Sequence, residues 1–326
     1  MIISQTPLRM SFAGGGSDLP AFYRAHGGAV ISTAIDKYVY VTVNKKFDEW
    51  IRVSYSKTEE VRSVAELDHK IVRAALGKRG IAGGVEITSV ADIPSRGTGL
   101  GSSSSFTVGL LHALSAYQGR YMSAEALAVE SCAVEIDLCG ERIGKQDQYA
   151  AAYGGFNMIR FNPDDSVIVE PIICRKDLVR QLEASLIVFY AGKTRSASSI
   201  LTEQSQQLED NRRSRDAMAR MVELAHCLRD ELHRHNLAAF GEILHENWML
   251  KRSLVSSISS PEIDECYERG RNAGAGGGKL LGAGGGGFLM FFAHPDRHAA
   301  IERALPGMRR VEFHFEPRGS RIMLFQ

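Results

Sequence analysis

The stretch that decides the fold is Pro94-Ser-Arg-Gly-Thr-Gly-Leu-Gly-Ser-Ser-Ser-Ser105. Its glycines Gly97, Gly99 and Gly101 form what we call the central glycine turn, and because glycine has no Cβ the backbone there can bend closely around a ligand. Ser102–Ser105 then begin a run with apolar residues at helical spacing, which predicts a helix. The free N–H groups and the dipole at such a helix start attract phosphate, and the serine hydroxyls add donors and a candidate Mg²⁺ ligand. A flexible Gly/Ser loop with a serine cap is the alternative, but the apolar periodicity favours a real helix.

A second glycine-rich segment is Pro7-Leu-Arg-Met-Ser-Phe-Ala-Gly-Gly-Gly-Ser-Asp18, which ends in what we call the N-terminal glycine turn, Gly14–Asp18. A predicted strand carrying Arg9 leads into this turn. Arginine is suited to bridge the oxygens of a transferring phosphoryl group, and Asp18 could accept hydrogen bonds from two vicinal sugar hydroxyls. On spacing alone, a solvent-facing arginine and an exposed turn aspartate are the simpler interpretation.

The C-terminal glycine turn, Gly282-Ala-Gly-Gly-Gly-Gly287, matches the dinucleotide-binding pattern G-x-G-x-x-G. That pattern requires a helix after the glycines, whereas Phe288–Phe292 is typical of a strand. We therefore reject a nicotinamide-binding fold and predict a tight turn between two strands, which could pack on the central glycine turn.

The segment Ala133–Gln148, which comes after the predicted phosphate-binding helix, contains four acidic residues. Glu135 lies on a second predicted helix, Ala124–Cys139, and Asp147 lies in the loop after it. Mg²⁺ prefers a carboxylate together with phosphate oxygens, and a hydroxyl nucleophile needs a carboxylate to orient it and take its proton. Spacing alone cannot choose among Glu135, Asp137, Glu141 and Asp147.

The composition excludes several classes of function. The chain has 326 residues, of which 44% are hydrophobic, and 39 basic and 38 acidic residues give a formal net charge of +1. We expect no nucleic-acid or membrane partner, because no block of like charge and no long apolar run is present. Five cysteines without a C-x-x-C pair favour a reduced, cytoplasmic location, and Met1–Pro7 shows no signal peptide.

The pattern of strands and helices predicts an α+β fold with a domain boundary near residue 180, giving domains 1–180 and 181–326. The expected strands include Gly28–Ile35, Tyr38–Asn44, Val85–Val90, Phe156–Phe161, Val167–Ile172, Leu186–Tyr190, Phe288–Phe292, Val311–Phe315 and Arg321–Phe325. In the second half, one long helix is expected from Ser196 to about His235, followed by helices near Leu237–Leu250, from Pro261, and at Pro295–Leu305.

Together, Pro7–Asp18, Pro94–Ser105 and Leu281–Phe288 resemble the three signatures of the galactokinase, homoserine kinase, mevalonate kinase and phosphomevalonate kinase (GHMP) family, in the family's order. The resemblance implies an N-terminal domain like domain 2 of ribosomal protein S5 and a ferredoxin-like C-terminal domain, with the active site between them. It also implies an enzyme, an ATP-dependent sugar kinase, with Mg²⁺ as cofactor and a small sugar or sugar phosphate as partner. Whether the chain forms a homo-oligomer is left open.

The resemblance assigns roles to single residues. Asp147, within Gly144-Lys-Gln-Asp-Gln148, would be the catalytic aspartate, Arg9 would assist phosphoryl transfer, and Ser103 and Glu135 would be the Mg²⁺ ligands. The residues implied for ATP are Pro94, Gly97, Gly99, Leu100, Gly101, Ser102, Ser103 and Ser104. Those implied for the sugar are Gly16, Ser17, Asp18, Lys193 and Arg195.

One departure from the family pattern narrows the choice of sugar substrate. Galactokinases carry Gly-Glu-His-Thr where this chain has Gly14-Gly-Gly-Ser17, so the side chains that help to hold galactose are missing. Leu8–Asp18 and Thr194-Arg-Ser-Ala-Ser-Ser199 are more similar to the bacterial D-glycero-D-manno-heptose 7-phosphate kinases, which phosphorylate the anomeric hydroxyl. Lys193 and Arg195 could then bind the substrate phosphate, or could be solvated loop charges. An L-fucose kinase, another sugar 1-kinase and a non-catalytic ATP- and sugar-binding sensor are the alternatives.

Overall fold

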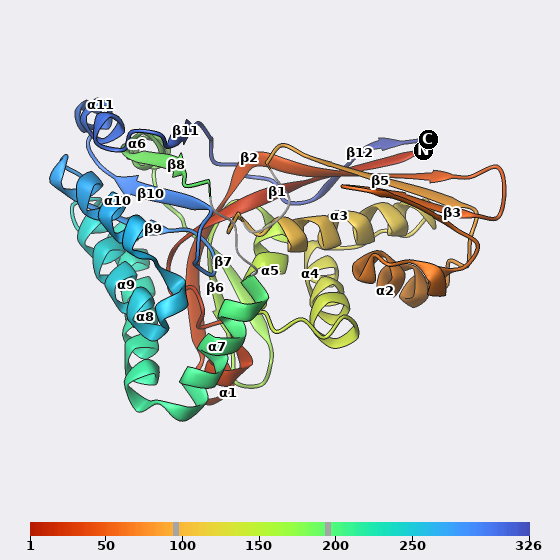
Figure 1. Ribbon diagram of the computed structural model, residues 1–326, viewed down its shortest axis with the longest axis horizontal. Helices are drawn as coiled ribbons and strands as arrows, with labels where there is room; N and C mark the ends of the chain where they lie inside the picture. Colours follow the sequence, from red (N-terminus) through yellow and green to blue (C-terminus); the bar gives the residue numbers. More distant parts are fainter. Residues whose placement is uncertain (94–97, 193–196) are drawn as a thin grey trace.

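The computed structural model describes residues 1–93, 98–192 and 197–326. Within these ranges the strands form one eight-stranded and one four-stranded sheet, towards opposite ends of an elongated molecule (Figure 1). The larger sheet contains β1 (Ile2–Ala13), β2 (Gly28–Lys45), β3 (Ile51–Ser54), β4 (Thr58–Val61), β5 (Val85–Ala91), β6 (Phe156–Phe161), β7 (Val167–Pro171) and β12 (Arg321–Phe325). The smaller sheet contains β8 (Leu186–Tyr190), β9 (Gly277–Leu280), β10 (Phe288–Phe292) and β11 (Arg309–Val311).

All described strand pairs are antiparallel except β3 with β5, which confirms the α+β class. The order in the larger sheet is β12-β1-β2-β5-β3-β4, and β6 also pairs with β2. The strands expected at Gly28–Ile35 and Tyr38–Asn44 are one strand of 18 residues. They merge because β1 pairs along both halves, while β6 pairs with the first half and β5 with the second.

Helix α3 (Ser102–Tyr117) begins at the predicted residue and packs on β1 and β2. Most of its apolar residues are buried, as the helical spacing indicates. Gly109 lets the helix approach the sheet closely, because a Cβ there would lie 2.8 Å from Oγ1 of Thr6. The Ser4 hydroxyl donates to the Gly109 carbonyl oxygen at 2.8 Å. Helix α3 is thereby fixed against the strand that carries Arg9.

The helices that carry Glu135 and Asp147 differ from the predicted ones. Helix α4 (Ala124–Cys132) does not continue to Cys139 but passes into a π-helix, η2 (Ala133–Leu138). Asp147 lies not in a loop but in the first turn of α5 (Gln146–Tyr153). The sequence hides this helix start because residue 145 is a lysine, whose side chain makes no capping hydrogen bond.

The long helix expected from Ser196 to His235 is two helices, α7 (Ala197–Asp210) and α8 (Arg212–His233). Asn211 separates them, and its side chain accepts from the N–H of Arg213 at 2.9 Å, so it caps the second helix.

The remaining helices of four residues or more are α1 (Pro20–His26), α2 (Lys70–Arg79), α6 (Lys176–Ser185), α9 (Phe240–Leu254), α10 (Pro261–Asn272) and α11 (Pro295–Ala304). The strand expected at Val311–Phe315 ends early, at Val311. Beyond that point the chain turns to the larger sheet, where Phe315 bridges Ile35.

The two sheets share a hydrophobic core. One buried cluster contains Phe12 from β1 together with Phe240 from α9 and Phe288 from β10, and the Phe12 and Phe240 rings lie 5.3 Å apart. The last strand, β12, returns to pair with β1. A domain boundary near residue 180 stays a prediction. If it is correct, the last strand of the second domain, β12, belongs to the larger sheet, whose other strands come from the first domain.

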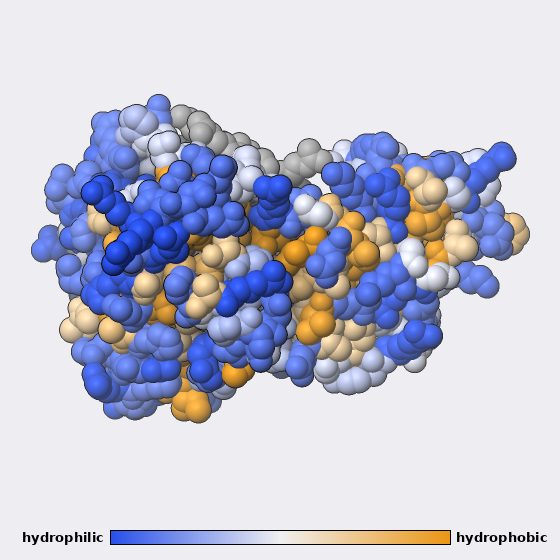
Figure 2. All heavy atoms as spheres, turned by 90° about the horizontal axis from the view of Figure 1, so that it is seen from below, coloured by the Kyte–Doolittle hydropathy of each residue, from blue (hydrophilic) through white to orange (hydrophobic). Residues whose placement is uncertain are grey.

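Figure 2 shows the side of the molecule seen from below. This surface is mostly hydrophilic, and hydrophobic residues gather towards its middle. In the part of the chain that the structure describes, no helix is both long and apolar enough to cross a membrane.

Candidate active site

Gly99 of the central glycine turn and Gly282 of the C-terminal glycine turn are packed backbone to backbone. A Cβ on Gly282 would overlap the Cα of Gly99, and a Cβ on Gly99 would overlap the carbonyl oxygen of Leu281. Both glycines also have a positive φ, 80° and 76°, which side chains disfavour. This arrangement confirms the predicted packing of one turn on the other and explains why glycine is needed at both contact points.

The Arg9 guanidinium holds the Asp147 carboxylate. Nε of Arg9 donates to Oδ1 of Asp147 at 2.8 Å, and Nη2 donates to Oδ2 at 2.9 Å. Nη1 donates to the Gly99 carbonyl oxygen at 2.6 Å. Arg9 is only 3% exposed, so the solvent-facing arginine that spacing favours is wrong. Since a guanidinium is planar and always charged, Arg9 fixes the position of the Asp147 carboxylate relative to Gly99.

Asp18 is buried, and it connects the N-terminal glycine turn to α5. Its Oδ2 accepts from the N–H of Gln146 at 3.1 Å, and its Oδ1 accepts from the N–H of Gly16 at 3.1 Å. A Cβ on Gly144 would overlap this carboxylate. Burial raises the pKa of Asp18, and the negative charge of Asp147 raises it further. Asp18 therefore caps the helix that carries Asp147, although the exposed turn aspartate was the simpler expectation.

Gly16 and Ser17 lie in the same turn and stay predictions as sugar contacts. The Ser17 hydroxyl donates to the Ala29 carbonyl oxygen and accepts from the Ala29 N–H, both at 3.1 Å. These two bonds tie the turn to β2. A Cβ on Gly16 would overlap Nε2 of Gln204, so α7 approaches the turn closely there.

Glu135 lies beside the first turn of α3. The Ser103 hydroxyl donates to Oε1 of Glu135 at 3.0 Å, and Nε2 of Gln148 donates to Oε2 at 2.6 Å. Glu135 is 1% exposed, and this burial raises its pKa. It sits in the π-helix, a local distortion that is frequent at functional sites.

The Ser103 and Glu135 oxygens fit a Mg²⁺ ion. A buried carboxylate and a hydroxyl are ligands of the kind that Mg²⁺ uses, and phosphate oxygens and water complete such sites. Among the ion pairs that the described residues form, none neutralises Glu135. The described residues contain no group of three or more His, Cys, Asp or Glu side chains that could hold a metal ion, so a metal here would need oxygens from a ligand as well.

The helix start that the central glycine turn leads into is available to an anion. Gly101, with φ 76°, precedes the first helical residue, and no side chain among the described residues caps α3. The first N–H groups of a helix have no acceptor within the helix, which leaves those of Ser102, Ser103 and Ser104 for a ligand. Leu100 is buried, and its carbonyl oxygen accepts from the Arg9 N–H at 3.0 Å.

Some predicted residues cannot be placed. Pro94 and Gly97, predicted for ATP, and Lys193 and Arg195, predicted for a substrate phosphate, lie outside the described residues. The described candidates, by contrast, gather in one place, where the glycine turns, α3 and α5 meet.

Lys251, which no sequence pattern indicated, reaches this site from α9. Its Nζ donates to the Gly282 carbonyl oxygen at 2.9 Å and lies 3.5 Å from that of Gly15. A Cβ on Gly15 would be 3.7 Å from this Nζ and 3.9 Å from Oε1 of Gln146. No motif surrounds Lys251 in the sequence, and its position in the last turn of an amphipathic helix is typical of a solvated lysine.

Two buried amide side chains beside the N-terminal glycine turn have atoms without a hydrogen-bond partner among the described residues. Oε1 of Gln146 and both amide atoms of Gln204 find no hydrogen-bond partner among the described residues. An unpaired buried polar group costs about 1–3 kcal/mol, so such groups are rare outside sites where a ligand or water satisfies them.

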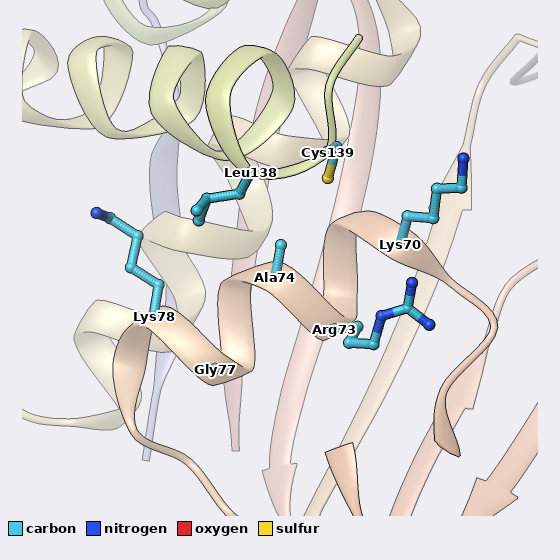
Figure 3. Close-up of a pocket in the computed structure, with 7 residues that line it drawn as sticks. All are labelled: Lys70, Arg73, Ala74, Gly77, Lys78, Leu138 and Cys139. Carbon is cyan, nitrogen blue, oxygen red and sulfur yellow. The ribbon is translucent and has the colours of Figure 1, made fainter. Parts of the chain in front are cut away.

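A surface groove of about 570 Å³ lies between α2 and the end of the π-helix. In Figure 3 the cationic side chains of Lys70 and Arg73 lie at one end and that of Lys78 at the other. Leu138 and Cys139 form the opposite wall. The groove adjoins the element that carries Glu135, but none of the predicted site residues lines it.

Comparison with known proteins finds the same family in both halves of the chain. The family of GHMP kinases N terminal domains matches residues 62–155, and the family described as GHMP kinases C terminal matches residues 228–308. The D-glycero-alpha-D-manno-heptose 7-phosphate kinase of Campylobacter jejuni is 29% identical over 319 residues, 93% of each chain. The mevalonate kinase of Methanothermobacter thermautotrophicus is 30% identical over 273 residues, 80% of this chain and 82% of that protein.

Among solved structures, a D-glycero-D-manno-heptose 1-phosphate kinase from Bacteroides thetaiotaomicron is similar over the full length of both chains, with a TM-score of 0.81 and 25% identity. The likeness thus extends over both sheets, including the elements that bring Arg9, Asp147 and Lys251 together.

Proposed function

Because this chain belongs to the GHMP kinase family, we propose that it transfers the γ-phosphate of ATP to the anomeric hydroxyl of D-glycero-D-manno-heptose 7-phosphate. The chain is a kinase with an alcohol group as acceptor, and it has the family's two-domain fold of helices and sheets. The heptose phosphate is supported by the relative from Campylobacter jejuni and by the glycines that replace the galactose-binding side chains. A reaction that consumes ATP also fits a cytoplasmic location.

One observation carries the proposal: Asp147, held by Arg9, lies beside the open N-terminus of α3. A Cβ on Gly101, which precedes α3, would be 3.3 Å from Cγ of Asp147. A phosphate bound at the helix start would therefore lie close to a fixed carboxylate. Phosphoryl transfer depends mainly on alignment and charge stabilisation, and this arrangement supplies both.

In the proposed mechanism the ATP phosphates lie over Gly97–Ser105, where the first N–H groups of α3 bind them. When bound, Mg²⁺ neutralises part of the phosphate charge, and Ser103 and Glu135 are the residues that would hold it. Asp18 accepts a hydrogen bond from the sugar. Asp147 orients the reacting hydroxyl and is the acceptor for its proton, and Arg9 stabilises the transferring group.

The substrate phosphate needs cations of its own. We assign this role to Lys193 and Arg195, whose spacing after β8 and similarity to the heptose kinases support it. A double variant with both residues changed to alanine should raise the KM for a sugar phosphate and leave the KM for ATP unchanged.

The test is a kinase assay with the full chain, ATP and Mg²⁺ against heptose 7-phosphate, fucose, galactose and mannose. We expect ADP release with the heptose phosphate and a new phosphate signal on the anomeric carbon by ³¹P NMR. If fucose is turned over faster than the heptose phosphate, the proposed acceptor is fucose instead. No turnover with any sugar would favour a sensor that binds both ligands without catalysis.

A further inference from the structure

Lys251 is a buried cation that contacts two glycine turns at once. Its side chain extends from α9 and is 4% exposed. Of its ammonium contacts, one goes to the C-terminal glycine turn, at Gly282, and one to the N-terminal glycine turn, at Gly15. A lysine is rarely buried in this way unless its ammonium group is paired or hydrogen-bonded.

A single peptide group connects Lys251 to Asp18. The carbonyl oxygen of Gly15 faces Lys251 Nζ at 3.5 Å, and the N–H of Gly16 donates to Oδ1 of Asp18 at 3.1 Å. These two atoms belong to the same planar peptide unit, whose C=O and N–H polarise together. The positive charge on one side therefore strengthens the hydrogen bond to the carboxylate on the other.

The surrounding charges favour this coupling. Asp18 and Asp147 attract the Lys251 ammonium, while Arg9 and the buried Lys279 repel it. Arg9 is engaged with Asp147, and Asp18 has no ion-pair partner within 4 Å among the described residues. Among the described residues, Lys251 is therefore a buried cation, not engaged in an ion pair, that attracts the Asp18 carboxylate. Burial lowers the pKa of Lys251 to about 8 and raises that of Asp18.

We propose that Lys251 is a positioning residue for the acceptor, which fixes the Gly15–Gly16 peptide and thereby keeps the Asp18 carboxylate charged and aimed at the sugar. This inference rests on the proposed function, because it takes Asp18 as the sugar ligand. It places a determinant of acceptor binding on α9, outside the N-terminal turn. Loss of the charge should weaken acceptor binding and leave the nucleotide site, built on α3, nearly unchanged.

The first test compares Lys251→Met and Lys251→Arg with Lys279→Met. Lys279 is an equally buried lysine, but its Nζ donates to the carbonyl oxygens of Ser11 and Phe12, at 2.8 and 3.3 Å, and to neither glycine turn. Hydrogen bonds to charged groups contribute about 1.5–3 kcal/mol, so Lys251→Met should raise the acceptor KM about 10-fold to 100-fold.

The KM for ATP should change less than about 3-fold, and Lys251→Arg should restore part of the acceptor affinity. Lys279→Met should lower the melting temperature without raising the acceptor KM. An unchanged acceptor KM in Lys251→Met, or equal rises in the two methionine variants, would overturn the proposal.

The second test uses the wild-type enzyme and therefore does not depend on whether a variant folds. Lys251 carries its charge below its pKa of about 8 and loses it above, so wild-type kcat/KM for the acceptor should fall as the pH rises from 7 to 9. A sugar phosphate has its second pKa near 6, so its own charge is constant over this range. A flat profile for the acceptor would count against Lys251. Failure of the wild-type enzyme to phosphorylate any sugar would instead remove the proposed function, and the inference with it.

Discussion

Nε and Nη2 of Arg9 each hold one carboxylate oxygen of Asp147, although 138 positions separate the two residues in the chain. Arg9 lies on a buried strand, and Asp147 lies in the first turn of a short helix whose start no local side chain caps. The orientation of the acid therefore depends on the larger sheet. Substitutions at either member of this pair should affect catalysis more than folding of the sheet.

Replacing Arg9 with lysine should separate geometry from charge. A lysine keeps the positive charge but cannot make the two parallel hydrogen bonds, so kcat should fall about 10-fold to 100-fold, as for loss of one charged hydrogen bond. Steady-state kinetics would measure this fall in kcat. Arg24→Lys is the matched control, since Arg24 makes an exposed pair with Asp165 and should leave kcat unchanged. Wild-type kcat in Arg9→Lys would show that the two parallel hydrogen bonds to Asp147 are unnecessary for catalysis.

Asp147→Asn should remove the proton acceptor and keep the shape of the site. General base catalysis contributes about 100-fold to 10,000-fold, so kcat should decrease within that range while the Kd for ATP changes little. Isothermal titration and turnover measurements would test both expectations. Asp137→Asn changes an exposed acid of the same region and should be neutral. Turnover close to wild type in Asp147→Asn would exclude this residue from the mechanism.

Ser103→Ala should raise the Mg²⁺ concentration needed for half-maximal activity. The variant removes the hydroxyl that now donates to Glu135, and a carboxylate alone binds Mg²⁺ less well than a carboxylate with a second oxygen. Titration of activity with Mg²⁺ at saturating ATP measures the change. Ser105→Ala is the control: the Ser105 hydroxyl donates to the Pro7 carbonyl oxygen at 2.8 Å, so its loss should reduce stability only. The same Mg²⁺ requirement in both variants would contradict the metal site.

Gly282→Ala should destabilise the protein and weaken nucleotide binding. The new methyl group would overlap the Cα of Gly99 at a residue with positive φ, and strain of this kind costs about 1–3 kcal/mol. Gly77→Ala is the opposite case, since nothing lies within 4 Å of its added Cβ in α2; it should stabilise by about 0.5–1 kcal/mol. Denaturant unfolding would compare the two variants. A neutral Gly282→Ala would mean that the two turns can separate without cost.

The sequence predicted those elements whose signals are local. Helix α3 begins at Ser102 because glycines and an apolar periodicity mark it, and α10 begins at Pro261 because Ser260 caps it. Strands β6 and β7 lie where the two short strands Phe156–Phe161 and Val167–Ile172 were predicted. The three glycine turns gave most of the candidate site, since each lies in a recognisable local pattern.

The remaining parts depend on contacts between residues far apart in the chain. Asp18 accepts from the first N–H of α5 from 128 positions away, so nothing near Asp147 signals a helix. The change from α4 to the π-helix at Ala133 has no local marker. Lys251 lies 236 positions from Gly15 in the N-terminal glycine turn, and only the folded chain reveals that it is buried.

The contact of Gly99 with Gly282 has a consequence for how the two substrates bind. Neither residue has a rotamer that could absorb a displacement, so any movement of one backbone segment must be passed to the other. Lys251 holds the Gly282 carbonyl oxygen, which extends this connection to the acceptor side. Occupancy of one substrate site should then alter the affinity of the other site, by the same factor in both directions.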